Sequence, residues 1–359
     1  MDKSFFTQML KRPRLPACLP VIAGLFLTTA PGWSEDPIKD VFVATGGIRG
    51  ESREIETGTI SISEGAREWE RVFSGGKVED HFTHGNDNMI RALTYGEGRF
   101  VAAGNKGIGV MVSENGRDWR FAREELGGPG GFCIAFTDGK FLIPTANSFH
   151  VSDDGESWES TNMSPQLQER HQVGAWGSDG AGHVRKVVGV NGVFVFAGER
   201  RFGSTADGKT FLHHEILPAG EKQRNYFLLA GAGRFLYLHE NGHRTSTDGV
   251  NWEPLVIESD DPEVVKEQVG GVWTGSEFVV PGAKAIYRSS DGLEWEKTPV
   301  ESGPPSIITA GNGMLVGKIW QAFRVSLDEG RTWTDIKQEV PCRQIYFFDG
   351  ERIIGAGGG

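Results

Sequence analysis

Two segments of the chain gather residue types that could do chemistry. The first contains Asp80, His81, His84, Asn86 and Asp87 and leads into Arg91, and the second contains His171, Trp176 and Asp179 and leads into His183 and Arg185. Four of the nine histidines lie in these two segments. General acid–base catalysis and anion binding both use imidazole, carboxylate and guanidinium groups. The two segments could therefore form either a catalytic site or an anion-binding site.

One reaction that these groups would suit is β-elimination on a uronic acid. An Arg or His would neutralise the carboxylate, a His or Tyr would take the C5 proton, and a Tyr would protonate the leaving oxygen. Glycosidic hydrolysis would instead need two carboxylates flanking the bond, for which Glu199 and Glu240 are available. The candidate catalytic residues are therefore His84, His183, Arg185, Glu199 and Tyr226.

Binding without chemistry needs only exposed aromatic and basic side chains. Trp176 and Trp320 stand outside the repeat described below and could stack on a sugar ring. The candidate ligand-binding residues are Arg91, Trp176, Arg200, Arg201, Trp320 and Arg343.

No metal site and no cofactor is predicted. The chain lacks His-Glu-x-x-His, paired Cys-x-x-Cys and Gly-x-Ser-x-Gly motifs. His213 and His214 are neighbours on a predicted strand, so their side chains point to opposite faces. His81 and His84, with Asp80 and Asp87 nearby, form the one loop cluster in which a metal is conceivable.

The elements that must position these residues form a repeat. The phrase Ser/Thr-x-Asp-(x)-Gly-x-x-Trp occurs seven times, with some copies degenerate. The seven copies end at Trp69, Trp119, Trp158, Phe211, Trp252, Trp295 and Trp333. The first copy, from Ser61 through Ser63 and Gly65 to Trp69, is the most degenerate. Self-similarity of this kind indicates a repeat architecture.

A second phrase, two apolar strands joined by a tight turn, accompanies the first. Its turns are Glu97-Gly98, Asp138-Gly139, Asn191-Gly192, Ala232-Gly233, Gly275-Ser276, Asn312-Gly313 and Asp349-Gly350. The distance from turn to following aromatic stays at 19 to 21 residues, which indicates two hairpins of fixed size per unit. Seven units of four strands predict an all-β fold, a seven-bladed β-propeller of four-stranded antiparallel blades.

The first phrase resembles the Asp-box (BNR) repeat of sialidases and many other secreted propellers. The resemblance implies that the turns are structural and lie on the outer rim, away from the ligand face. The last hairpin, Gln344 to Gly357, has no Asp-box after it, and the first Asp-box has no clear hairpin before it. The N- and C-terminal strands are therefore expected to close the ring by completing one blade together. Val41–Thr45 resembles a second strand, so which terminus supplies which strand stays open.

Sialidase chemistry, as the resemblance implies it, needs three arginines on a carboxylate, a tyrosine nucleophile with a carboxylate base, and an acid. Arg91, Arg185 and Arg343 could supply the arginines. Tyr226 or Tyr346 could be the nucleophile, and Glu199 or Asp87 the acid. The Arg-Ile-Pro signature that precedes the first Asp-box in sialidases is absent, which puts this activity in doubt.

Insertions indicate where a ligand would bind. The connections from Trp69 to Gly98 and from Trp158 to Gly192 span 29 and 34 residues, against 17 to 24 for the others. Both lead from an outer strand to the next inner strand, so their extra length is expected at one mouth of the central channel. Inert insertions are the alternative.

Net charge narrows the class of partner. The chain carries −11, which argues against a nucleic-acid binder driven by bulk electrostatics. Arg and Lys outnumber acids at the predicted inner-strand starts and at the loops between second and third strands, so an anionic carbohydrate or protein ligand is expected there. Whether the protein is an enzyme or a binding scaffold stays open, and a monomer is expected.

The N-terminal segment is predicted to be an export signal. Basic residues up to Arg14 precede the apolar run Leu19–Leu27 and then small residues, which is the order of a secretory signal peptide. We expect residues 1–34 to be removed and residues 35–359 to form the propeller, secreted or periplasmic, with no membrane span in the mature chain. Cys133 and Cys342 then remain, and no disulfide framework is indicated.

Overall fold

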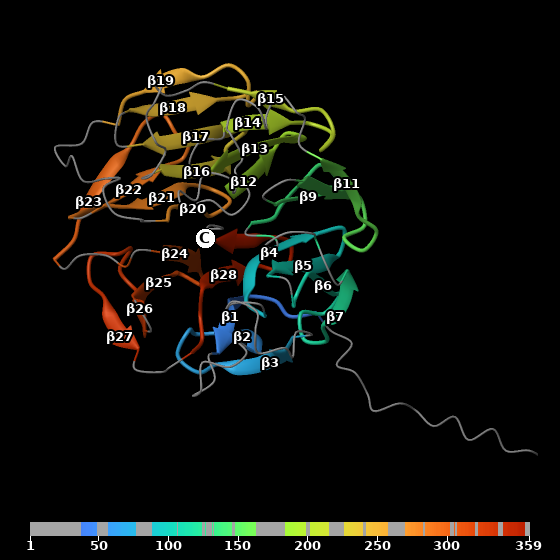
Figure 1. The fold of residues 1–359 in the computed structure, drawn as a ribbon. Coiled ribbons are helices and arrows are strands. Elements are labelled where there is room, and N and C mark those ends of the chain that lie inside the picture. Colours follow the sequence, from blue (N-terminus) through green and yellow to red (C-terminus); the bar gives the residue numbers. More distant parts are fainter. Residues whose placement is uncertain are drawn as a thin grey trace, which may run out of the picture. The chain divides into compact units, whose positions relative to one another are not determined.

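The computed structural model describes the residues that build a ring of β-sheets. These are residues 37–48, 57–76, 88–105, 107–123, 126, 131, 133–145, 148–162, 184–198, 202–214, 226–239, 242–257, 270–282, 284–301, 305, 307–319, 322–336 and 340–355. Within this part of the chain every regular element is a strand, and all strand pairs are antiparallel. The sheets are the seven blades of a β-propeller, as the repeat predicts (Figure 1).

Six blades contain four strands each, in simple sequence order from the channel outward. Blade 2 consists of β4 (Ile90–Gly96), β5 (Arg99–Gly104), β6 (Val110–Ser113) and β7 (Arg120–Arg123). Blade 3 consists of β8 (Ala135–Thr137), β9 (Lys140–Pro144), β10 (Ser148–Ser152) and β11 (Glu159–Asn162). Blade 4 consists of β12 (Val184–Val190), β13 (Val193–Gly198), β14 (Phe202–Thr205) and β15 (Leu212–His213).

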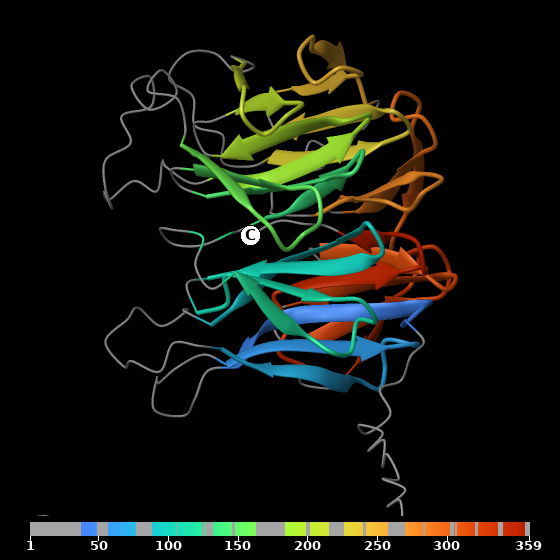
Figure 2. The ribbon, with the colours of Figure 1, turned by 90° about the vertical axis from the view of Figure 1, so that its right-hand side faces the viewer.

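The other three regular blades follow the same order. Blade 5 consists of β16 (Tyr226–Gly231), β17 (Arg234–His239), β18 (His243–Ser246) and β19 (Glu253–Leu255). Blade 6 consists of β20 (Val272–Trp273), β21 (Phe278–Pro281), β22 (Ala285–Ser289) and β23 (Glu296–Pro299). Blade 7 consists of β24 (Ile307–Gly311), β25 (Met314–Ile319), β26 (Ala322–Ser326) and β27 (Thr334–Ile336). Figure 2 shows these strands running from one end of the ring to the other.

Blade 1 closes the ring with strands from both parts of the chain. Its five strands lie in the order β29 (Ile353–Gly355), β28 (Gln344–Phe348), β1 (Val41–Ile48), β2 (Thr57–Ser63) and β3 (Glu70–Gly75). The strands β28, β1, β2 and β3 correspond to the four strands of a regular blade. The N-terminal strand β1 is the second of these four, since it pairs with β28 from Val41↔Phe348 to Thr45↔Gln344. The expected closure by both termini is present, with β29 added as a fifth strand on the channel side.

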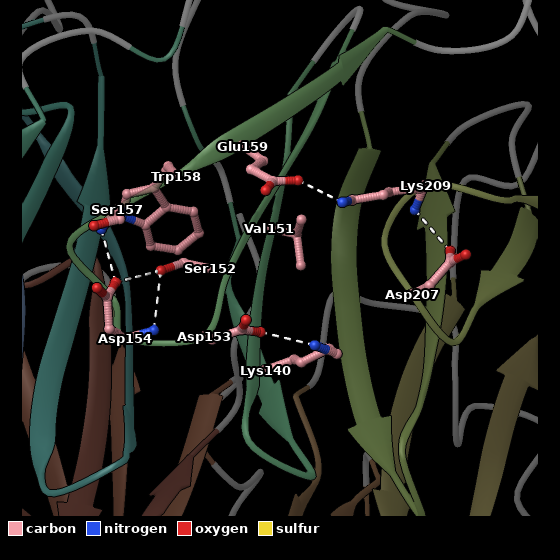
Figure 3. Close-up of a pocket in the computed structure, with 10 residues that line it drawn as sticks. All are labelled: Lys140, Val151, Ser152, Asp153, Asp154, Ser157, Trp158, Glu159, Asp207 and Lys209. Atoms are coloured by element: carbon pink, nitrogen blue, oxygen red, sulfur yellow. Dashed lines mark hydrogen bonds and ion pairs between the residues drawn. The ribbon is translucent and has the colours of Figure 1, made fainter.

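The turns between third and fourth strands share one geometry, with Asp in five copies of the repeat and Asn115 in the copy of blade 2. In six of them the first hydroxyl accepts the N–H of the glycine at 2.8 to 2.9 Å. In blade 3, Asp154 Oδ1 also accepts the N–H of Ser157 at 2.7 Å (Figure 3) and the N–H of Glu156 at 2.8 Å. The carboxylates therefore satisfy backbone donors, as expected for turn aspartates.

The degenerate first copy has a different register from the one predicted. Trp69 Nε1 donates to Ala66 O at 3.3 Å, the bond that Trp119, Trp158, Trp252 and Trp333 make to their turn glycine. Ala66 has a φ of 55°, so it occupies the glycine position in place of Gly65. Ser63 then takes the position of the first hydroxyl, and this copy contains no turn aspartate.

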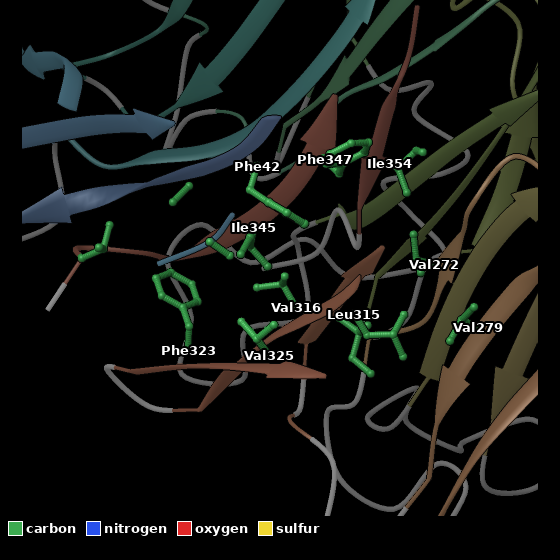
Figure 4. Close-up of a cluster of buried hydrophobic side chains, with 14 of the residues drawn as sticks. Phe42, Val272, Val279, Leu315, Val316, Phe323, Val325, Ile345, Phe347 and Ile354 are labelled. Carbon is green, nitrogen blue, oxygen red and sulfur yellow. The ribbon is translucent and has the colours of Figure 1, made fainter. Parts of the chain in front are cut away.

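The hydrophobic core lies between neighbouring blades. Trp69 of blade 1 stacks on Phe323 of blade 7 at 5.1 Å, and Phe211 of blade 4 stacks on Phe149 of blade 3 at 4.2 Å between ring centroids. Figure 4 shows the cluster that joins blades 6, 7 and 1, in which the Phe42 and Phe347 centroids are 5.0 Å apart. Aromatic side chains of the repeat thus hold each sheet against the next, which supplies most of the apolar burial.

Trp273, which does not belong to the repeat, packs where two blades approach each other closely. Trp273 packs on Gly231 of the preceding blade, where an added Cβ would lie 2.3 Å from its ring. Trp273 is therefore a packing residue near the turn end of the channel.

Candidate functional site

The candidate site lies at the end of the ring where the innermost strands begin, which we call the mouth. Four residues expected there fall within the described chain. Arg91 lies in β4, Arg185 in β12 and Tyr226 at the start of β16, and Arg343 directly precedes β28. Because every regular blade has the same strand order, these positions on blades 1, 2, 4 and 5 lie at the same end of the channel.

The remaining candidate residues lie outside the described residues. They are His84, Trp176, His183, Glu199, Arg200, Arg201 and Trp320. The alternatives Asp87 and Glu240 lie there as well. Their placement stays a prediction.

Two similar β-bulges position Arg91 and Arg185. The register of β4 and β5 shifts between Ile90 and Ala92, and that of β12 and β13 shifts between Val184 and Lys186. Arg91 and Arg185 are the extra residues at these two β-bulges. A bulge leaves its extra residue out of the ladder and redirects its side chain, and bulges are common next to binding sites.

The side chain of Arg91 is held by a residue that directly follows the second strand of its blade. Arg91 Nε donates to Asn105 Oδ1 at 2.6 Å, and Asn105 is buried just after β5. The Asn105 N–H in turn donates to Met89 O at 3.0 Å. This arrangement fixes the half-buried guanidinium of Arg91 at the mouth.

A second pair of cations meets where blades 7 and 1 adjoin. Burial lowers the pKa of Lys318, and the nearby positive charge of Arg343 lowers it further. Arg343 is exposed, and its backbone N–H donates to Thr45 O at 2.6 Å. Burial also raises the pKa of the neighbouring Cys342 thiol to about 12, so this cysteine stays protonated at neutral pH.

Inside the channel is a cavity of about 250 Å³. Its lining comes from the inner strands of blades 2 to 6 and from β28 and β29 of blade 1. The lining residues are Leu93, Thr94, Ile134, Ala135, Phe136, Lys186, Val187, Val188, Gly189, Phe227, Leu228, Leu229, Ala230, Gly271, Trp273, Tyr346, Ile353 and Gly355. Lys186 is the one charged residue among these described lining residues. From the sequence it was only one of several basic residues near the predicted starts of the inner strands.

Lys186 is half-buried where it borders the cavity. Its Nζ lies 5.9 Å from the centroid of the Phe227 ring on blade 5. Burial lowers the pKa of Lys186 to about 8. The neighbouring Cys133 is buried, and burial raises its pKa, so the thiol is neutral at neutral pH. Both Cys133 and Cys342 are free thiols.

Two tyrosines near the channel have structural contacts. The buried Tyr346 hydroxyl accepts the N–H of Leu93 at 3.3 Å, which ties blade 1 to blade 2. The Tyr226 ring stacks on Tyr237 at 5.9 Å, and Tyr237 stacks on His239 at 5.7 Å. Tyr226 is therefore oriented by an aromatic stack on blade 5.

The larger hollow in Figure 3 lies on the outer rim between blades 3 and 4, with a volume of about 480 Å³. Lys140 pairs with Asp153 at 2.7 Å, and Lys209 of blade 4 pairs with Glu159 of blade 3 at 2.5 Å. Asp154 and Asp207 at this hollow are turn aspartates that accept backbone N–H groups. Its charges are thus paired within the protein, so the channel stays the candidate site although its cavity is smaller.

Among the described residues no group of three or more His, Cys, Asp or Glu side chains could hold a metal ion. A helix long and apolar enough to cross a membrane is likewise not found in the described part of the chain.

Comparisons with known proteins show the fold. No family model and no curated protein matches the chain. Virginiamycin B lyase from Staphylococcus aureus is similar in structure, with a TM-score of 0.52, 13% identity, and coverage of 74% of this chain and 94% of that chain. A streptogramin B lyase gives a TM-score of 0.52, 11% identity, and coverage of 74% and 92%.

A catalytically inactive form of the Staphylococcus aureus lyase with quinupristin gives a TM-score of 0.52, 12% identity, and coverage of 87% of this chain and 98% of that chain. At this level of identity the likeness is one of architecture. The three comparisons agree with the sheet order in identifying the chain as a seven-bladed β-propeller.

Proposed function

We propose that this chain is an exported Asp-box propeller that binds an anionic glycan or protein ligand at the mouth of its channel. The observation that carries the proposal is the charge at that end of the ring. Arg91, Arg185, Lys186, Lys318 and Arg343 are described there on blades 1, 2, 4 and 7. A cluster of cations on a chain of net charge −11 attracts and orients anions.

The Asp-box assignment is supported by the shared turn geometry. Six turns use the first hydroxyl to bind the glycine N–H, and their aromatic residues pack between blades. In this assignment the seven turns maintain the scaffold, and ligand binding belongs to the mouth. Residues 1–34 act as the export signal, and residues 35–359 make up the propeller.

Catalysis on a uronic-acid or sialic-acid glycan is the alternative. It is supported by Arg185 and Tyr226, which begin the inner strands of the adjacent blades 4 and 5. In a lyase, Arg185 would neutralise the carboxylate and Tyr226 would return a proton to the leaving oxygen, with His84 or His183 as base. Appearance of double-bond absorbance with polygalacturonate would establish this alternative, and release of reducing ends would establish hydrolysis.

Binding is tested with polygalacturonate, heparin and polysialic acid, with neutral dextran as control. Each of Arg91→Ala, Arg185→Ala and Arg343→Ala should weaken binding of the preferred polyanion about fivefold, as expected for a partly exposed ion pair worth ~1 kcal/mol. Lys297→Ala is the matched control because it removes one positive charge from exposed Lys297 on the outer strand β23. Equal binding of dextran, or an equal effect of Lys297→Ala, would refute the proposal.

A further inference from the structure

The side chain of Asn312 joins blade 7 to the N-terminal strands β1 and β2, and we call this boundary the seam. Asn312 lies in the turn between β24 and β25. Its Nδ2 donates to Asp40 O at 2.9 Å and to Glu64 O at 3.2 Å. Both acceptors are carbonyl oxygens, so the amide nitrogen is the atom that must face them. Asp40 directly precedes β1 and Glu64 directly follows β2, so one amide group attaches both strands to blade 7.

An equivalent contact occurs between blades 4 and 5. Asn191, in the corresponding turn of blade 4, donates through Nδ2 to Gly233 O at 3.1 Å. Gly233 precedes β17 as Asp40 precedes β1, and both residues have a positive φ, of 71° and 54°. The partners of this contact are 42 residues apart in sequence, whereas Asn312 and Asp40 are 272 residues apart. Asn191 is therefore an internal reference for Asn312, in the same turn but between blades that follow each other in the chain.

Both asparagines are followed by glycine, and an Asn-Gly pair can deamidate without an enzyme. The glycine nitrogen forms a bond to Cγ of the asparagine, the Cγ–Nδ2 bond breaks, and the N–H proton leaves with ammonia. Water then opens the resulting succinimide at either of its carbonyls, which leaves aspartate or isoaspartate. Glycine favours this reaction because it has no side chain to crowd the ring. The reaction needs a glycine nitrogen that is not held in another contact.

The hydrogen bonds of the glycine nitrogens distinguish the Asn-Gly pairs. The described residues include three such pairs, at Asn115, Asn191 and Asn312. The Gly116 N–H donates to Ser113 Oγ at 2.8 Å. The Gly192 N–H donates to Thr137 Oγ1 at 3.2 Å. The Gly313 N–H has no hydrogen-bond partner within the described part of the chain, so its nitrogen is the one that can react.

The surroundings of the two exposed turns differ in the same direction. A Cβ added at Gly192 would lie 3.1 Å from Asp138 Oδ2, whereas one added at Gly313 would meet nothing within 4 Å. A carboxylate beside the nitrogen disfavours the deprotonated form that attacks Cγ. Asn312, Asp40 and Glu64 are all exposed, so the amide can leave its acceptors without a change in the core.

We propose that Asn312 is a deamidation site and that its deamidation weakens the seam. A carboxylate has no hydrogen to donate, so the product would turn an acceptor toward Asp40 O and Glu64 O and leave both carbonyls without their donor. An isoaspartate would also lengthen the two-residue turn by one backbone carbon. The inference concerns closure of the ring and is independent of the proposed ligand.

The site is tested by incubating the wild-type protein at pH 9 and measuring each Asn-Gly pair by peptide mass spectrometry. Asn312 should deamidate at least about fivefold faster than Asn191, the ratio that one hydrogen bond at the Gly192 nitrogen implies. Thr137→Val removes the acceptor of that bond and should raise the rate at Asn191 while leaving the rate at Asn312 unchanged. An intact Asn312, or equal rates at the two asparagines in the wild type, would overturn the site.

The effect on the seam is tested by melting temperature. Asn312→Asp should lower the melting temperature by about 2 °C or more, and the matched variant Asn191→Asp should lower it less, because it loses one hydrogen bond and not two. Incubated wild-type protein should contain a fraction that melts lower, equal to the fraction deamidated at Asn312, which gives the comparison even if Asn312→Asp does not fold. Unchanged melting of the deamidated fraction, or equal effects of the two variants, would overturn the role of Asn312 in the seam.

Discussion

At the residue scale, Lys186 is held in the channel at a cost to stability. Its pKa of about 8 lies below the ordinary lysine value of about 10.4, because burial disfavours the charged form. The folded protein therefore binds fewer protons than the unfolded chain between pH 8 and pH 10.4. The penalty is complete below pH 8 and is lost as the pH rises to 10.4. Residues that reduce stability in this way are common in functional sites.

Lys186→Met should therefore stabilise the protein at pH 7. We expect the free energy of unfolding to rise by about 1–3 kcal/mol at pH 7, and most of this gain to be lost by pH 10.5, where the lysine is neutral in the folded protein and about half neutral in the unfolded chain. Urea unfolding of wild type and variant at pH 7 and pH 10.5 measures this difference. Lys297→Met, on the exposed outer strand, should stay within about 0.5 kcal/mol at both pH values. A destabilised Lys186→Met protein at pH 7 would contradict the argument.

The sequence predicted turn residues better than channel residues. Burial alone would raise the pKa of Asp154, but N–H groups of Ser157 and Glu156 lower it to about 2, as the turn motif implies. The depth of Lys186 had no comparable signal. It depends on a one-residue register shift at Arg185, and a bulge whose extra residue is not a glycine leaves no mark in the hydrophobic pattern.

At the element scale, β29 shows the limit of the repeat pattern. The Asp349-Gly350 turn resembles the other tight turns, which predicts that the strand after it is the second strand of a blade. That position is occupied by β1, which pairs with β28 on its outer side. The last strand therefore pairs with β28 on the channel side, from Tyr346↔Gly355 to Phe348↔Ile353. Local sequence specifies the hairpin, and long-range pairing decides on which side it lies.

The two isoleucines of β29 should differ in their contribution to stability. Ile354 is 5% exposed and belongs to the cluster that joins blades 6, 7 and 1, and its carbonyl accepts the Thr309 hydroxyl at 2.7 Å. Ile353 is half-buried and lines the cavity. Ile354→Ala should lower the free energy of unfolding by about 2–4 kcal/mol, and Ile353→Ala by about 1 kcal/mol. Equal losses in urea unfolding would show that β29 does not hold the position described here.

At the scale of the whole molecule, closure of the ring joins distant parts of the chain. Six blades are continuous in sequence, and blade 1 alone depends on pairing between β1 and β28. The repeat count was sufficient to predict seven blades and closure by both termini. Of the expected site residues, four are placed at the mouth, and seven lie outside the described residues, where their position stays a prediction.

Two truncations test closure and the assignment of the N-terminal segment together. A chain that begins at Glu35 keeps β1 and should melt in one cooperative transition at the temperature of the full-length chain. A chain that begins at Arg49 lacks β1, including the buried Phe42, Val43 and Ala44. Both β28 and β2 then lose a paired edge, and exposed edges of apolar strands associate.

We expect the shorter chain to lose the cooperative transition and to elute as aggregates in size-exclusion chromatography, because removal of one strand opens the only blade that links the two ends of the ring. Scanning calorimetry of the three chains measures the transition. A chain from Arg49 that melts like the full-length protein would mean that the ring does not depend on β1. A chain from Glu35 that fails to fold would mean that residues 1–34 are part of the folded structure and not an export signal.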